Sequence, residues 1–188
     1  APGATATAVK ELVLAGMLMA ARNLAPALDF VRQLKDEDLE SRVEDGKKQF
    51  AGFELPGHTL GVIGLGKIGS LVADAAIRLG MNVLGYDPHI TVEAAWSLPS
   101  AVKRAASVDE VLKASHFVTL HIPLVEKTRN TVNAKNVDHM RGGAVLLNFS
   151  RDGVVEDKAV RQALNDGRLR WYVTDFPSPA LVASEQVI

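Results

Sequence analysis

The chain has 188 residues, enough for one well-buried domain with an appendage but short for two full domains. Its 21 basic and 22 acidic residues give a formal net charge of -1, so no global field would draw nucleic acid or anionic lipid, and the expected partners are small molecules or protein. It contains no cysteine, which excludes disulfides, thiolate catalysis and cysteine-ligated metals and fits a reducing compartment.

The first predicted element is a buried helix near the amino end. The run LVLAGMLMAA, residues 12–21, is the most apolar in the chain, but it is about half as long as the roughly 20 residues needed to cross a bilayer. Glu11 abuts it and no basic leader precedes it, so a signal peptide is not indicated either. We therefore expect a helix over about residues 6–23, apolar on nearly all sides, in a cytoplasmic protein without a membrane partner.

A second helix and a charged tract follow. Pro26 suits the first turn of a helix over residues 27–35, in which apolar residues recur at every third position. The tract KDEDLESRVEDGKKQF, residues 35–50, is expected to form a solvated helix face or a loop. We assign residues 1–50 to these N-terminal helices and residues 51–188 to a nucleotide-binding domain.

From Thr59 onward, short apolar runs alternate with helical stretches. Each intervening stretch is long enough for a crossover helix, which is typical of a parallel sheet covered on both faces. Because parallel crossovers are almost always right-handed, the most economical topology is a doubly wound α/β sheet of the Rossmann type. A weaker strand is expected over residues 102–105. The stronger runs are TLGVIG, NVLGYD, HFVTLHIP, AVLLNFS and WYVTDF.

The first apolar run leads into a glycine-rich loop, GLGKIG, that opens a helix. A lone G-x-G-x-x-G pattern is weak evidence, but here a strand precedes it and a helix follows, as a dinucleotide-binding loop requires. Gly64 permits the tight turn, Gly66 lets the backbone approach a pyrophosphate, and Gly69 lets the helix pack closely on the strand. The start of the helix at Lys67 and Ile68 adds free backbone amides and the positive end of the helix dipole.

An acidic residue stands at the separation that this type of site requires. Asp87 ends the run NVLGYD, 18 residues after Gly69, where a carboxylate can accept hydrogen bonds from both ribose hydroxyls of the adenosine half. The same charge would repel a 2′-phosphate, so the predicted cofactor is NAD rather than NADP. The alternative is a structural strand-turn-helix unit with an incidental aspartate.

Polar residues at the ends of later strands extend the candidate site, because ligands of open parallel sheets bind outside the carboxyl ends of the strands. His121, Pro123 and Thr128 follow one run and are expected beside the cofactor. Asp175 ends the last run, where it either binds the nicotinamide carboxamide or caps a helix. The other histidines are expected in turns or at the surface, and none has metal-ligand spacing, so no metal is predicted. They are His58, His89, His116 and His139.

The stretch NFSRDG places a cation, Arg151, after a nearly continuous apolar strand and therefore at the ligand crevice. We place Phe149 and Ser150, which precede it, beside the cofactor. A guanidinium can hold a carboxylate through two parallel hydrogen bonds, and a 2-hydroxy acid held in this way presents its reacting carbon for hydride transfer. The alternative role of Arg151 is a surface ion pair with Asp152 or Glu156.

Together these motifs resemble the D-2-hydroxyacid dehydrogenases, over nearly the whole chain and in the family's order. The segments that resemble the family are AVKELVLAGMLMAARN, GHTLGVIGLGKIGSLVADAAIRLGMNVLGYDP, HFVTLHIPLVEKT, LLNFSRDGVVED and YVTDFP. The resemblance implies that the glycine loop, Asp87, the segment 121–124, Thr128 and Asp175 surround NAD, and that Arg151 binds the substrate's carboxylate as a catalytic residue. Within the family, the motifs are most like those of bacterial members that oxidise D-3-phosphoglycerate.

The resemblance also implies a second domain, outside these 188 residues, that carries the histidine base in a P-H-x-G motif. The helix over residues 6–23 would link the two domains and pack across a two-fold dimer interface. The chain departs from the family at two places: Ala180 stands where a glutamate usually pairs with that histidine, and Asp152 replaces a glycine after Arg151. Two alternatives stay open, namely a dehydrogenase for another D-2-hydroxy acid and a non-catalytic NAD-sensing module.

Overall fold

The computed structural model describes residues 5–35 and 39–188. Its centre is a six-stranded sheet in which all the paired strands are parallel, in the order β3-β2-β1-β4-β5-β6. This is the order of a dinucleotide-binding doubly wound sheet, so the predicted Rossmann-type α/β fold is confirmed. The strands are β1 Thr59–Ile63, β2 Asn82–Tyr86, β3 Val102–Arg104, β4 Phe117–Leu120, β5 Ala144–Asn148 and β6 Leu169–Thr174.

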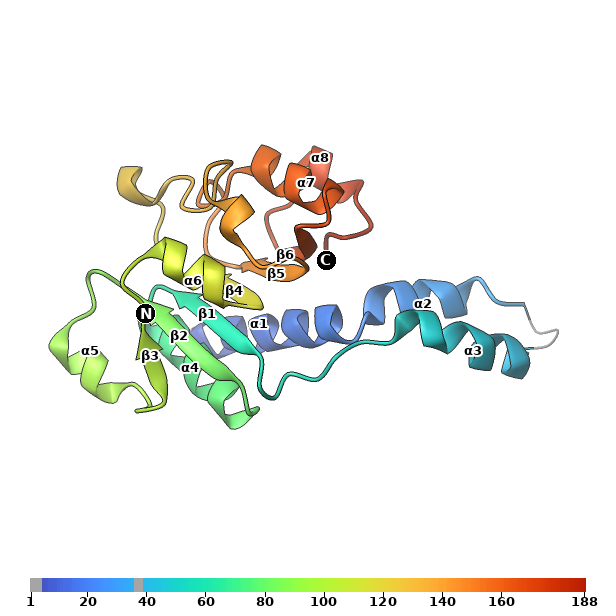
Figure 1. The fold of residues 1–188 in the computed structure, drawn as a ribbon, viewed down its shortest axis with the longest axis horizontal. Helices are drawn as coiled ribbons and strands as arrows, with labels where there is room; N and C mark the ends of the chain where they lie inside the picture. Colours follow the sequence, from blue (N-terminus) through green and yellow to red (C-terminus); the bar gives the residue numbers. More distant parts are fainter. Residues whose placement is uncertain (1–4, 36–38) are drawn as a thin grey trace.

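Helices cover both faces of the sheet (Figure 1). One core packs the side chains of α1 and α4 against one face, and it includes Met17, Val72 and Leu147. The other core packs α6 and α7 against the opposite face and includes Leu112 and Leu146. Because neighbouring residues of β5 point to opposite faces, its continuous apolar run contributes to both cores. The helices are α1 Ala6–Ala21, α2 Leu24–Arg32, α3 Leu39–Lys47, α4 Lys67–Arg78, α5 Val92–Ser97, α6 Val108–Ala114, α7 Asp157–Asn165 and α8 Pro179–Val182, with short 3₁₀ turns η1 Lys48–Phe50, η2 Glu126–Thr128 and η3 Val137–His139.

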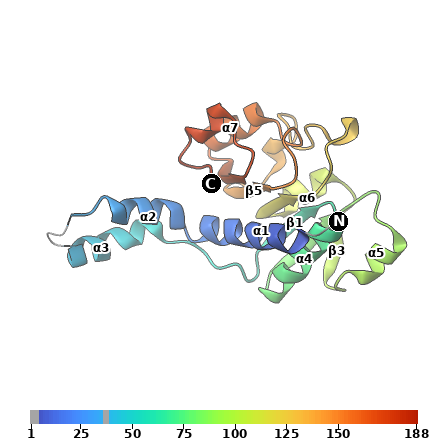
Figure 2. The same cartoon turned by 180° about the vertical axis from the view of Figure 1, so that it is seen from behind.

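Helices α2 and α3 form an arm that extends away from the sheet, as both views show (Figures 1 and 2). Neither helix of the arm has a buried residue. For α3 this agrees with the solvated helix face predicted over residues 35–50, of which residues 36–38 lie outside the described part of the chain. Helix α2 begins at Leu24, earlier than the predicted start at residue 27, and Pro26 lies in its first turn as expected.

A buried asparagine, Asn23, lies where the arm meets the rest of the fold. Asn23, between α1 and α2, has a left-handed backbone with φ of 51°. Its Nδ2 donates to the carbonyl of Ala51 at 3.1 Å, and its Oδ1 accepts a hydrogen bond from Arg170 on β6 at 2.9 Å. Asparagine suits this position because it tolerates left-handed geometry and has both a donor and an acceptor.

The predicted apolar helix near the amino end is α1, and it packs on the sheet. Val13, Met17 and Ala20 are fully buried in the core that α1 shares with α4. Among residues 5–35 and 39–188, no single helix is long and apolar enough to cross a membrane; α1 and α2 reach that length and composition only as a pair bent by 66°. The domain boundary near residue 50 stays a prediction.

Candidate cofactor and substrate site

The glycine loop holds α4 directly against the end of β1. Gly64 has a φ of +94°, and its amide donates to the Tyr86 carbonyl at 2.8 Å. A Cβ on Gly64 would collide with the His121 carbonyl oxygen, and a Cβ on Gly69 would collide with the Gly64 carbonyl oxygen. Both positions therefore exclude side chains, for the reasons predicted from the motif: a tight turn at Gly64 and close helix-strand packing at Gly69.

The space above the middle glycine is open. A Cβ on Gly66 would meet no atom within 4 Å. The backbone φ of -71° would also allow a side chain at this position. Gly66 is also the N-cap of α4, so the amides of Lys67, Ile68 and Gly69 have no carbonyl four residues earlier within the helix. Backbone amides beside an open surface at a helix start suit an anionic phosphate, and the residues present therefore fit the pyrophosphate of NAD.

Asp87 lies at the glycine loop, directly after β2. Its Oδ2 accepts a hydrogen bond from the Leu65 amide at 2.9 Å, and its Oδ1 accepts one from the His89 amide at 2.9 Å. Each carboxylate oxygen keeps a further lone-pair position for a ligand hydroxyl. The loop and the acidic residue, 22 positions apart in the chain, thus form one structural unit.

A cavity of about 300 Å³ lies at the carboxyl edge of the sheet, beside the start of α4. It brings together many of the residues predicted at separate strand ends, and it adds Thr5 and Val9 from the amino end of the chain. Its lining consists of Thr5, Val9, Ile68, His121, Ile122, Pro123, Phe149, Ser150 and Arg151. The sequence contained no signal for Thr5 and Val9, because only the packing of α1 on the sheet places them there.

His121 contributes a neutral ring to this cavity. Its Nε2 lies 2.9 Å from the hydroxyl of Thr119 on β4, and its buried Nδ1 has no partner among the described residues. Burial lowers the pKa of His121 to about 4, because the charged ring would lose its hydration. At neutral pH the ring is uncharged, so it can form hydrogen bonds to a ligand but is a weak base.

Arg151 is exposed at the rim of the same cavity. Its Nη1 donates to the Ser150 carbonyl at 2.6 Å. No carboxylate of the described residues lies within ion-pair distance of the guanidinium, and one oxygen of Glu156 accepts a hydrogen bond from the Ala134 amide instead. The alternative of an ion pair with Asp152 or Glu156 is therefore not observed.

A buried asparagine that was not predicted from the sequence, Asn148, supports the turn formed by residues 148–151. Asn148, the last residue of β5, accepts hydrogen bonds from the amide of Ser150 at 3.1 Å and from its hydroxyl at 2.8 Å. Its Nδ2 donates to the Arg151 carbonyl at 3.1 Å. The available signal was a polar residue that ends an otherwise apolar strand. Asn148 fixes the backbone from which the arginine extends.

Of the residues predicted after the later strands, two lie outside the cavity lining, Thr128 and Asp175. The hydroxyl of Thr128 donates to the Pro123 carbonyl at 2.5 Å and accepts from the Val125 amide at 2.9 Å, so it closes the loop after β4. Asp175 is exposed after β6, and the N-cap of α8 is Ser178, so the capping alternative for Asp175 is wrong. Cofactor contact by Thr128 and Asp175 stays a prediction. In the described part of the chain, no group of three or more potential metal ligands occurs.

Comparisons with known proteins show the family of this chain. The sequence model of the family described as D-isomer specific 2-hydroxyacid dehydrogenase, NAD binding domain, matches residues 14–186. The chain is 39% identical to a D-3-phosphoglycerate dehydrogenase of Methanocaldococcus jannaschii, covering 90% of the chain and 30% of that relative. It is 34% identical to a hydroxypyruvate reductase of Thermotoga maritima, covering 89% of the chain and 50% of that relative.

A solved structure shows the same fold. The apo form of Rhodotorula graminis D-mandelate dehydrogenase superposes with a TM-score of 0.83 at 27% identity, covering 98% of this chain and 55% of that one. The chain thus spans between about a third and a little over half of these proteins. The match to the family model, residues 14–186, includes the glycine loop and the strand ends described above.

Proposed function

Because the chain belongs to the D-isomer specific 2-hydroxyacid dehydrogenases, whose NAD-binding domain it forms, we propose that it serves the oxidation of D-3-phosphoglycerate to 3-phosphohydroxypyruvate, a step of L-serine synthesis. Bound NAD supplies the hydride acceptor in this reaction. The observation that supports the proposal most is the position of Arg151, which has no ion-pair partner in the described structure and lies on the cavity that the neutral His121 also lines.

In this proposal different residues of the chain bind different parts of NAD. The amides of residues 66–69 bind the pyrophosphate, and the carboxylate of Asp87 accepts hydrogen bonds from the adenosine ribose. The residues that line the cavity, with the Thr128 loop and Asp175, surround the nicotinamide half. Arg151 binds the carboxylate of the hydroxy acid through its two parallel donors and so orients C2 toward the cofactor.

The base that removes the hydroxyl proton lies outside this chain. The histidine in the cavity has a pKa of about 4, which is too low for a base that works near neutral pH. We therefore assign the proton to a histidine of the substrate-binding domain, as the family resemblance implies. The isolated chain is expected to bind NAD without turnover. We also place the protein in the cytoplasm, which suits a chain without cysteine.

The test of substrate choice uses the full-length protein with NAD. The proposal predicts a higher kcat/KM for D-3-phosphoglycerate than for D-glycerate or D-lactate. Turnover only of an unphosphorylated acid would instead favour the alternative of another D-2-hydroxy acid, for which the resemblance to a hydroxypyruvate reductase is the supporting observation. NAD binding without turnover of any of these acids would favour the non-catalytic NAD-sensing module.

The role of Arg151 has its own test in the full-length protein. Arg151→Gln removes the paired donors, each worth about 1.5–3 kcal/mol when the partner is charged, so kcat/KM should fall about 10²–10⁴-fold. The Kd for NAD should stay within about twofold, because the proposal assigns the guanidinium to the substrate and not to the cofactor. Arg161→Gln on the exposed face of α7 is the matched control and should keep both values. An equal loss in both variants, or a loss of NAD binding with Arg151→Gln alone, would contradict the assignment.

We further propose that the first two helices form a two-fold homodimer interface. Several large apolar side chains of α1 and α2 are at least 42% exposed, namely Leu12, Leu18, Leu24, Leu28 and Val31. Apolar residues left exposed on adjacent helices indicate a protein partner. Leu28→Glu should convert a dimer to a monomer in sedimentation equilibrium, whereas Val182→Glu, at an exposed apolar position on α8, should not. A monomeric parent protein would refute the interface.

A further inference from the structure

A second cavity lies at the opposite edge of the sheet, where β1, β4 and β5 begin. It has a volume of about 130 Å³ and is lined by Phe53, His58, His116 and the turn 141–144. His58 directly precedes β1, His116 directly precedes β4, and the turn leads into β5. Ligands of open parallel sheets bind at the carboxyl ends of the strands, so this cavity belongs to neither the proposed cofactor site nor the Arg151 site.

The two histidines of this cavity are packed together rather than separately exposed. The ring of His58 contacts Phe53 at a centroid distance of 4.9 Å and His116 edge-on at 4.6 Å. The Nδ1 of His116 accepts a hydrogen bond from the Thr59 amide at 3.0 Å. An Nδ1 that accepts must lack a proton, so the neutral ring has its proton on Nε2 and offers a donor there. The sequence predicted both histidines in turns or at the surface and gave no signal that their rings would be in contact.

The titratable residues that line the cavity are Arg141 and the two histidines, and no acidic residue lines it. Arg141 is exposed, and none of the carboxylates in residues 5–35 and 39–188 lies within ion-pair distance of it. Burial lowers the pKa of His116, and electrostatic repulsion from Arg141 and from His58 lowers it further. Arg170 does not line the cavity, but its guanidinium carbon lies 5.7 Å from the centre of the Phe53 ring, which does. Arg141 thus gives the cavity a positive charge with no carboxylate of the described residues within ion-pair distance, which favours an anion over a metal cation.

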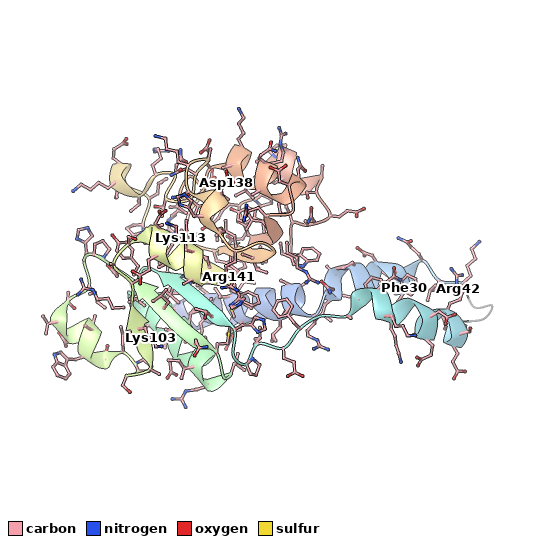
Figure 3. The ribbon with its side chains drawn as sticks, viewed as in Figure 1. Phe30, Arg42, Lys103, Lys113, Asp138 and Arg141 are labelled. Atoms are coloured by element: carbon pink, nitrogen blue, oxygen red, sulfur yellow. The ribbon has the colours of Figure 1, made fainter. Side chains whose placement is uncertain are left out.

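The turn beside Arg141 adds a backbone donor. The Ala144 amide donates to the Arg141 carbonyl at 3.0 Å, and Gly143 has a φ of +76°, which together define a tight turn. The Gly142 amide has no acceptor among the described residues, and a Cβ on Gly142 or Gly143 would meet no atom within 4 Å. The turn is therefore open to a ligand. Figure 3 labels Arg141 over the body of the fold, away from Phe30 and Arg42 of the arm.

We propose that this cavity is a second ligand site, for a phosphate group. Three of the residues that line it carry a hydrogen-bond donor: Arg141 in its guanidinium, His116 at Nε2 and Gly142 in its amide. A phosphate matches them because it has several acceptor oxygens and up to two negative charges, and guanidinium groups recognise it through paired hydrogen bonds. The proposal does not depend on the dehydrogenase assignment, because it uses none of the residues of that site.

The test is a titration of the isotope-labelled 188-residue chain with inorganic phosphate at constant ionic strength, followed by NMR. We expect saturable shifts of the Gly142 amide and the His116 ring. Arg141→Gln should weaken this binding at least tenfold, and His116→Asn, which keeps an acceptor for the Thr59 amide but removes the Nε2–H donor, should weaken it several-fold. Both variants should keep the parent's binding of NAD.

Controls separate this site from general charge effects and from the glycine loop. Arg161→Gln removes one positive charge elsewhere and should leave the phosphate titration unchanged. Phosphate shifts confined to the amides of residues 66–69, or an equal loss of affinity in Arg141→Gln and Arg161→Gln, would overturn the proposal. Acetate has one charge and two oxygens, so it should bind more weakly than phosphate. Acetate binding as tight as phosphate binding would contradict the phosphate assignment.

Discussion

Two glycines of the same loop should respond oppositely to the same substitution. Gly66 and Gly69 lie three positions apart at the start of α4, yet an added Cβ meets open space at Gly66 and the Gly64 carbonyl oxygen at Gly69. If the open space above Gly66 holds the pyrophosphate of NAD, a methyl group there should block the ligand without disturbing the fold. A methyl group on Gly69 should disturb the fold first.

The magnitudes follow from the geometry. Gly66 has a φ of -71°, which alanine adopts without strain, so Gly66→Ala should change the free energy of unfolding by less than about 1 kcal/mol. Its Kd for NAD should rise at least tenfold, which corresponds to about 1.4 kcal/mol. Gly69→Ala forces α4 away from β1, which should lower the free energy of unfolding by about 3 kcal/mol. The higher helix propensity of alanine should offset about 1 kcal/mol of this loss. Its stability should fall by about 2 kcal/mol, or about 4–8 °C in Tm.

Urea denaturation gives the stability of each variant, and calorimetric titration with NAD gives its affinity. The reasoning is refuted if Gly66→Ala binds NAD as tightly as the parent, because the space above that glycine would then have no part in binding. It is also refuted if the two variants lose the same stability, because the difference in packing around the two glycines would then have no energetic effect.

Three further changes test other contacts. Asp87→Asn keeps an acceptor for the glycine loop but removes the charge, so the affinity for NADP relative to NAD should rise about tenfold in competitive titrations; an unchanged ratio would contradict the cofactor preference. His121 has a folded pKa of about 4 against 6.5 in the unfolded chain, so its contribution of up to about 3 kcal/mol is present above pH 6.5 and lost as the pH falls toward 4. His121→Gln should reduce the loss of stability between pH 7 and 4.5 by about 2–3 kcal/mol, and an identical pH profile would count against a buried neutral ring. Asn23→Ala removes the hydrogen bonds at the root of the arm and should lower the free energy of unfolding by about 2 kcal/mol, whereas exposed Asn165→Ala at the end of α7 should have little effect; equal losses would contradict the role of Asn23.

The sheet was predictable from the sequence because its signal is local. Apolar runs buried on both faces, such as AVLLN in β5, differ in period and length from the helices between them. The glycine loop was predictable because a strand, a turn and a helix follow one another without interruption. Even the weak strand near residue 102 was found, as β3 at the edge of the sheet.

The site was predictable only in part, because its supporting contacts join distant segments. Val9 reaches the cavity from α1, more than a hundred positions from Phe149, and no sequence pattern relates the two. Likewise, the packing of His58 on His116 depends on the pairing of β1 with β4. Local sequence also suggested partners that the tertiary structure does not supply. Asp152 and Glu156 follow Arg151 closely but form no ion pair with it, and the helix after Asp175 has Ser178 as its N-cap.

The central claim, that NAD binds where α4 begins, is tested most directly by titrating the isotope-labelled chain with NAD and following its backbone amides. The account predicts saturable shifts for Gly66, Lys67, Ile68 and Gly69, together with the Leu65 amide that Asp87 binds. No saturation into the millimolar range, or shifts that leave these amides unchanged, would contradict it.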